Sequence, residues 1–218
     1  MNTQKGFTIV EMILAVSISA VIAATLLTIS LRYTGEMLRA RITADLAIES
    51  QILLRSIVED TRLADALSST NAISDTNAPS GGWVTSDPSN VLIIESPAIN
   101  STRDILYDSA TSLPYKNEVV YYALGTSMYR RSLKNSAAAG NIMTTTCPAA
   151  SATATCPADK LYTKYLKDLT FTFYDDSDTT TANATLARSV KITVTTERKI
   201  AGKTVTFANS IRTTMRNR

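Results

Sequence analysis

The chain has 218 residues, which is enough for one domain plus an extended element. Its 22 Lys and Arg residues nearly balance 19 Asp and Glu residues, so the charge gives no clear nucleic-acid signal. The sequence contains no His, which removes the commonest general base and the commonest transition-metal ligand.

The N-terminus combines a short polar leader with a long apolar segment. Residues 1–6 carry one charge, on Lys5, and end at Gly6, and an apolar run follows from Phe7 to Leu31. This run is long enough to cross about 30 Å of hydrocarbon as a helix. It exceeds the apolar core of a conventional secretory signal, and no Ala-x-Ala-like site closes it. We therefore predict a leader over 1–6 and a membrane span over 7–31.

Glu11 is the one charged residue within that span. A carboxylate in hydrocarbon costs about 2.5–3.5 kcal/mol on insertion scales, so it marks a functional site that needs a partner. No Lys or Arg lies within the run, but cleavage after Gly6 would create a cation, the α-amino group of Phe7. Phe7 precedes Glu11 by four residues and shares its helix face. Glu11 would neutralise this amine in its own chain or in a neighbouring copy.

The segment from Lys5 to Glu11, KGFTIVE, resembles the class III signal of type IV pilins and type II secretion pseudopilins. The resemblance implies that a prepilin peptidase cuts between Gly6 and Phe7, that Phe7 is N-methylated, and that Glu11 pairs with an adjacent subunit during assembly. It also implies a single-pass protein of the cytoplasmic membrane with its N-terminus inside, a point on which the positive-inside rule is ambiguous here. The alternative is an ordinary signal anchor with a chance glutamate.

Beyond Leu31 the apolar residues are confined to one face of a predicted helix. Apolar residues recur at intervals of three, four and seven from Leu38 to Leu67, with charged residues between them, which predicts an amphipathic helix over 32–67. Gly35 is its weak point and costs about 1 kcal/mol relative to Ala. One continuous helix is expected, with an apolar first half and a second half that packs on a globular domain, as in the pilin fold.

Residues 68–218 are expected to form a β-sheet domain, so the predicted fold class is α+β. The polar stretch Ser68–Asn90 is expected to be a loop, and Asp104–Tyr107 is a candidate for a short strand. The alternation of apolar residues predicts strands over Asn90–Glu95, Lys116–Leu124, Ser127–Leu133, Lys167–Tyr174, Arg188–Thr195 and Thr204–Ile211.

Two groups of residues are candidates for special chemistry. Cys147 and Cys156 are expected to form a structural disulfide outside the cytoplasm, and closing the loop 147–156 is worth roughly 2.5–3 kcal/mol. A redox or metal site is the alternative, but it needs more ligands than two cysteines without His. The acidic stretch Asp175–Asp178 offers carboxylates for Ca²⁺, but its spacing fits no EF-hand, so a solvated turn without metal or cofactor is expected.

The C-terminal half resembles J-type pseudopilins and W-type minor pilins. The resemblance rests on the hairpin Val119–Arg131, the Leu-x-Phe-x-Phe pattern at Leu169–Phe173, the later paired strands and the ending Met215–Asn217. It implies an antiparallel sheet packed on the outer half of the helix and a place in the tip complex that starts a filament. The implied partners are other pilins or pseudopilins, the prepilin peptidase, the inner-membrane assembly platform and membrane lipid.

These features predict a minor pilin or pseudopilin, a structural subunit rather than an enzyme, that reaches an extracytoplasmic filament or the cell surface. The lack of Gly and Pro from Phe7 through Thr34 favours a minor subunit, because many major pilins carry such helix breakers there. A major pilin and a signal-anchored extracytoplasmic enzyme or binding domain are the alternatives. Catalysis without His would need a Ser–Lys or Thr arrangement, and no such spacing stands out.

Overall fold

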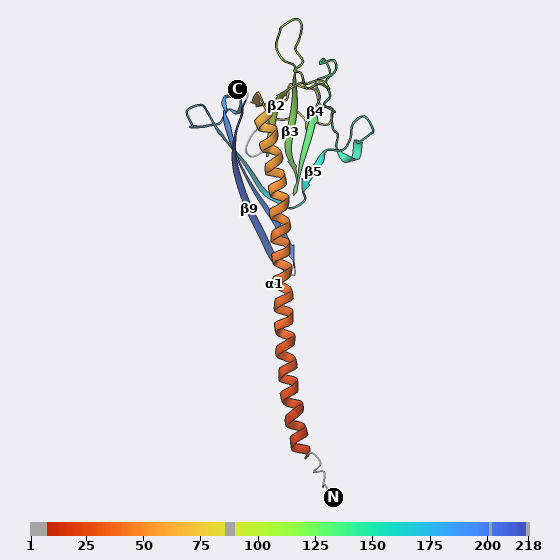
Figure 1. The fold of residues 1–218 in the computed structure, drawn as a ribbon, viewed down its shortest axis with the longest axis vertical. Helices are drawn as coiled ribbons and strands as arrows, with labels where there is room; N and C mark the ends of the chain where they lie inside the picture. The colour runs from red at the N-terminus through yellow and green to blue at the C-terminus, as the bar shows by residue number, and fades with distance from the viewer. Residues whose placement is uncertain (1–7, 86–89, 201, 217–218) are drawn as a thin grey trace. The chain divides into compact units, whose positions relative to one another are not determined.

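The computed structural model describes residues 8–85, 90–200 and 202–216. The chain divides into two compact units, Met1–Ala44 and Asp45–Arg218. The long N-terminal helix α1, Ile9–Leu63, begins in the first unit and ends in the second (Figure 1). The part of α1 in the second unit packs on antiparallel sheets, so the predicted α+β, pilin-like architecture is confirmed.

In the first unit, α1 presents its side chains outward. Every residue from Thr8 to Leu31 is exposed, including large apolar side chains such as Leu14, Leu26 and Leu31. By length and composition this helix contains a stretch able to cross a membrane. Since these apolar side chains have no cover within their own unit, the surroundings that suit them must come from outside it.

The end of α1 differs from the prediction. The helix stops at Leu63 rather than near Leu67, and Ala66–Ser68 forms strand β1. The backbone N–H of Asp65 already bonds the carbonyl oxygen of Glu95 at 2.9 Å, which turns the chain into the sheet. Tertiary pairing therefore overrides the helical periodicity over its last four residues.

The strands in the described residues form two antiparallel sheets. The first has five strands in spatial order β1-β2-β3-β4-β5. Its further members are β2 (Val91–Pro97), β3 (Lys116–Leu124), β4 (Ser127–Leu133) and β5 (Lys160–Thr163). Strands β1 and β5 were not predicted. The candidate strand at Asp104–Tyr107 is wrong, because Ile105 and Tyr107 form only isolated bridges, to Ile99 and Pro114.

The second sheet has four strands in spatial order β7-β6-β8-β9. Its members are β6 (Leu166–Tyr174), β7 (Thr180–Thr181), β8 (Ser189–Ile200) and β9 (Lys203–Thr214). Strands β8 and β9 form a long hairpin in which Ile200 pairs with Lys203. Gly202 lies in this turn with φ of 74°, a left-handed conformation that glycine adopts without strain.

The main core lies where α1 meets the inner faces of both sheets. Leu53 and Ile57 of α1 are fully buried there. Two short helices lie between strands, η1 (Ala149–Ser151) between β4 and β5 and η2 (Ala184–Leu186) between β7 and β8. The alternating apolar residues of β6 and β8, on which the prediction of these strands rested, are all buried in this core, namely Leu169, Phe171, Phe173, Val190, Ile192 and Val194.

A smaller core covers the opposite face of the five-stranded sheet. It joins Ile93, Val120 and Tyr122 of the sheet to Trp83 from the connection between β1 and β2. The predicted loop over Ser68–Asn90, in its described part, thus folds back as a cover on this face rather than running free.

Candidate functional site

The described chain begins with a reciprocal cap at the start of α1. The backbone N–H and the hydroxyl of Thr8 each donate to Glu11 Oε2 at 2.9 Å, and the Glu11 N–H lies 3.3 Å from the Thr8 hydroxyl oxygen. This is a capping box, which satisfies donors that the first helical turn would otherwise leave free. The Thr-x-x-Glu spacing is visible in the sequence, but our sequence analysis missed it.

Glu11 is nevertheless different from the other polar residues of the span. Ser17, Thr25 and Thr28 donate their hydroxyls to carbonyl oxygens three or four residues earlier, at 2.8–2.9 Å. A helix can therefore satisfy hydroxyl groups by itself in a medium without water. The donors of Thr8 carry no charge, so the Glu11 carboxylate has no cationic partner among the residues that the structure describes.

Gly6 and Phe7 lie outside the described residues. Cleavage between them, N-methylation of Phe7 and pairing of its amine with Glu11 therefore remain predictions. What the structure adds is the position of Glu11 in the first turn of α1, on a helix half whose side chains are exposed and otherwise uncharged up to Leu31.

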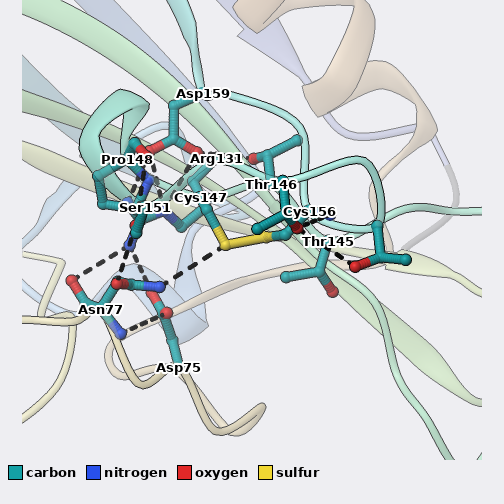
Figure 2. The surroundings of a disulfide bond; sticks show 12 residues. Asp75, Asn77, Arg131, Thr145, Thr146, Cys147, Pro148, Ser151, Cys156 and Asp159 are labelled. Atoms are coloured by element: carbon teal, nitrogen blue, oxygen red, sulfur yellow. Dashed lines mark hydrogen bonds and ion pairs between the residues drawn. A yellow bond between two sulfur atoms is a disulfide. The ribbon is translucent and has the colours of Figure 1, made fainter.

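A second polar cluster lies on the outer face of the five-stranded sheet, and sequence reasoning missed it. The side chain of Arg131 is 1% exposed, and it bonds Asp75 Oδ2 at 2.7 Å and Asp159 Oδ2 at 2.6 Å (Figure 2). Its guanidinium also lies over the rings of Trp83 and Tyr122, at 5.3 and 5.4 Å from their centroids. One buried cation therefore joins three segments far apart in the chain.

Both carboxylates of this cluster have further donors. The Trp83 indole N–H donates to Asp75, while the Tyr122 hydroxyl and the Thr146 hydroxyl donate to Asp159, at 2.7–2.8 Å. Burial alone would raise the pKa of Asp75, but the hydrogen bonds from Trp83 and Arg131 outweigh it and hold the pKa below its usual value. The cluster is thus a satisfied structural network rather than a site with free groups.

The predicted disulfide is present beside this cluster. Cys147 and Cys156 are bonded, with their Cα atoms 5.6 Å apart. The Cys147 N–H donates to the Pro157 carbonyl and the Asp159 N–H to the Cys147 carbonyl, at 2.9 and 2.7 Å. Figure 2 shows Asn77 reaching toward the Cys147 sulfur, 3.7 Å away. The bond therefore closes a loop that is fixed to the outer face of the sheet.

The acidic turn after β6 directs its carboxylates to local partners. Asp175 accepts from backbone N–H groups of its own turn at 2.9 Å. Asp176 pairs with Arg188 at 3.5 Å, and Asp178 pairs with Arg212. Among the described residues, no group of three or more His, Cys, Asp or Glu side chains is arranged to hold a metal ion.

A third network links α1 to the inner face of the five-stranded sheet. Asp60 of α1 accepts from Arg130 Nε at 2.7 Å and from the Tyr121 hydroxyl at 2.6 Å. Burial is the largest cause of a raised pKa for Tyr121, so it stays a protonated donor. The contact holds the last turns of α1 against the sheet.

Comparison with known proteins bears on the N-terminus. Residues 1–27 match a family model described as the prokaryotic N-terminal methylation motif. A search of curated protein sequences gave no match. The matched residues include Gly6, Phe7 and Glu11 of the predicted maturation signal. The chain therefore carries the class III signal of type IV pilins ahead of a pilin-like α+β fold, which supports a type IV pilin- or pseudopilin-type precursor and points to a structural subunit.

Proposed function

We propose that the protein is a minor pilin or pseudopilin that helps to start or cap a type IV pilus-like filament. The observation that carries the proposal is the Glu11 carboxylate, which lies on an exposed, otherwise apolar helix half and has no cationic partner in the described part of the chain. Such a charge is tolerated in hydrocarbon only when it finds a counter-charge. The motif implies other pilins and a prepilin peptidase as partners. Cleavage by the peptidase would create the Phe7 amine, and that amine on a neighbouring pilin would be the counter-charge.

The proposed sequence of events begins on the cytoplasmic side of the membrane. A prepilin peptidase cuts between Gly6 and Phe7, and Phe7 is then methylated. The mature protein waits with residues 7–31 in the membrane as a single pass. At the assembly platform its Glu11 carboxylate attracts the Phe7 amine of a neighbouring subunit, an interaction strengthened where water is excluded. The sheet domain then faces outward on the filament or at its tip.

The choice of a minor over a major subunit is supported by the form of α1. The helix continues without interruption from Ile9 to Leu63 and carries no Gly or Pro in its apolar half. The extended β8–β9 hairpin adds an exposed element that a tip subunit would use for specific contacts.

The replacement Glu11→Gln tests the proposed role. The Gln carbonyl oxygen still accepts from Thr8, so the start of α1 is preserved while the charge is lost. We expect at least about a tenfold drop in incorporation into sheared filaments, which corresponds to 1.4 kcal/mol of lost pairing. The matched control is Glu36→Gln, which removes an exposed glutamate of the same helix outside the apolar run. Equal incorporation of the two variants would refute the role of Glu11.

The mature N-terminus and the copy number separate the alternatives. Intact mass and N-terminal sequencing of protein from native membranes should show a start at methyl-Phe7. Few copies per filament support a minor subunit, whereas one copy per filament repeat would make the protein the major pilin. A start at Met1 would favour a signal-anchored domain instead.

A further inference from the structure

Strand β9 is an unusually long free edge. It forms one border of its sheet with 12 residues, whereas the other border strands have three residues in β1, four in β5 and two in β7 (Figure 1). A free edge offers unpaired N–H and C=O groups to any extended chain, and proteins usually shorten or block such edges. The length of β9 therefore needs an explanation.

The hairpin register shows which backbone groups are free. Ile200 pairs with Lys203 across a two-residue loop, and such closing pairs exchange hydrogen bonds. The alternation continues to the far end, where the Met215 N–H bonds the Arg188 carbonyl. The intervening residues thus direct their backbone groups away from β8, and within the described chain none of these groups has a backbone partner. They are Thr204, Thr206, Ala208, Ser210, Arg212 and Thr214, and all are exposed.

None of the usual devices that block an edge interrupts β9. The strand has no Pro, and its register with β8 runs through 12 consecutive pairs without a bulge. Its charged residues stand near the ends, at Lys203 and Arg212, and the segment Thr204–Ile211 between them is uncharged. The edge is therefore open to another strand along its middle.

Two cavities lie beside the second half of β9, and we refer to them together as the groove. One of about 210 Å³ lies between α1 and residues 209–211 of β9, and one of about 460 Å³ lies at Thr214 at the end of β9 and is also lined by Arg62 of α1. The first is lined on its apolar side by Leu54 and Val58 of α1 and Ile211 of β9. Because side chains of an added strand alternate between the two faces of a sheet, every second one would enter this groove.

The far end of the groove is positively charged. Arg62, Arg188 and Arg216 line the second cavity. Arg188 pairs with Asp176, whereas Arg62 and Arg216 have no carboxylate partner among the residues that the structure describes. Both side chains are exposed. An occupant that brings carboxylates to this end would complement the charge.

We propose that β9 is the docking edge for an extended segment of a different partner subunit. The segment adds antiparallel to β9, as every strand pair in both sheets does. It places apolar side chains at alternate positions in the groove beside Leu54 and Val58, and it carries carboxylates at its N-terminal end, opposite Arg62 and Arg216. This inference rests on the proposed function in one respect: the partner is assumed to be a subunit of the same filament.

A second copy of this chain fits the edge poorly. Strand β9 carries Lys203 and Arg212 and no Asp or Glu, so antiparallel pairing of two β9 strands would bring cations of both copies to the same border, with Asp178 as the one carboxylate paired to Arg212. Like charges facing each other across strands are destabilising, and the arginines of the groove would find no carboxylates. The charge pattern therefore favours a different chain with acidic residues.

Photo-crosslinking in the native cells tests this proposal on the full chain. A benzoylphenylalanine replaces Ala208, next to the free edge, and mass spectrometry identifies the cross-linked peptide. We expect a peptide of another chain with alternating apolar residues and Asp or Glu at its N-terminal end. A peptide of a second copy, a peptide without this pattern, or a yield no higher than from exposed Lys164 would overturn the proposal.

A pair of substitutions then isolates the backbone edge. Ser210→Pro removes an outward N–H without touching the β8–β9 bonds, whereas Ser210→Ala removes only the hydroxyl. We expect Ser210→Pro to lower the yield of the cross-link at position 208 by about tenfold, because a hydrogen bond to the partner strand is lost and the proline ring is added. Ser210→Ala should leave this yield unchanged. Equal yields from the two variants would contradict edge pairing.

Charge reversal gives an independent measurement that does not depend on the fold of β9. Arg62→Glu with Arg216→Glu should lower the same cross-link, and Lys164→Glu, an exposed control in the β5–β6 connection, should not. Equal yields would refute the acidic partner. The mature N-terminus is determined in the same samples, so an unprocessed precursor, which would count against the proposed function, is distinguished from a processed protein with an empty edge.

Discussion

Glu11 in the apolar half of α1 and Arg131 in β4 are both charged groups among apolar side chains, but among the residues that the structure describes only Arg131 has counter-charges. Arg131 is bound by Asp75 and Asp159 and enclosed by aromatic rings. Glu11 has only the uncharged donors of Thr8. The Arg131 network is therefore complete within one folded chain, whereas the proposed role of Glu11 in assembly would require the Phe7 amine of a neighbouring subunit.

The largest expected effect is the loss of Arg131. Arg131→Met leaves the buried carboxylates of Asp75 and Asp159 without their cation, which costs about 3–5 kcal/mol. Urea unfolding in detergent, followed by the fluorescence of Trp83, the one tryptophan of the chain, measures the loss. The control is Arg130→Met at the neighbouring position. Its partner Asp60 is partly exposed, so this substitution should lower the free energy of unfolding by less. If Arg131→Met lowered the free energy of unfolding no more than Arg130→Met does, Arg131 would not be the folding counterpart to Glu11 that is proposed here.

A pair of leucines on the same helix sharpens the contrast. Leu53 is fully buried and Leu26 is 62% exposed. Leu53→Ala removes packed methyl groups and leaves a cavity, so it should lower the free energy of unfolding of the sheet domain by about 2–5 kcal/mol. Leu26→Ala should leave that free energy unchanged and act only on membrane insertion or filament packing. Similar unfolding midpoints for the two variants would show that the halves of α1 are not separate in this way.

The smallest expected effect is a pH dependence at Glu118. Burial raises the pKa of this carboxyl above its usual 4.5, although the backbone N–H groups of Ala72 and Ile73 bond it. A raised folded-state pKa means that the native state binds the proton more tightly, so stability falls as the pH rises from about 4.5 through the folded pKa. Glu118→Gln has no such titration and is the control. We expect the unfolding midpoints of the two proteins to diverge over this range, with the wild type losing stability; parallel curves would contradict the assignment.

Periodicity in the sequence was enough to predict much of the fold. The alternation at Leu169–Phe173 and Val190–Val194 predicted two strands, because this pattern is local, and the structure buries the alternating apolar residues. The same reasoning assigned Leu67 to α1, since a helical spacing cannot show that Asp65 bonds Glu95 across the sheet. The short strand β5 escaped because it spans only four residues after a low-complexity stretch.

The candidate sites also divide into those with a local sequence signal and those that appear only in the folded chain. Glu11 was found because a single carboxylate in an apolar run is a local signal. The Arg131 network was not, because its partners Asp159 and Asp75 lie 28 and 56 residues away and their spacing follows only from the folded sheet. The Cys147–Cys156 pair was predictable because the chain has no other cysteines.

The disulfide has a consequence for following this protein in the cell. Such bonds form in oxidising compartments and are rare in the cytosol. Cys147 and Cys156 lie in the domain after the apolar run, and no cysteine precedes them. If the domain crosses the membrane as proposed, the oxidation state of this pair, read by thiol alkylation before and after reduction, would report that translocation. A pulse-labelled precursor would gain resistance to alkylation at the moment its domain reaches the far side of the membrane.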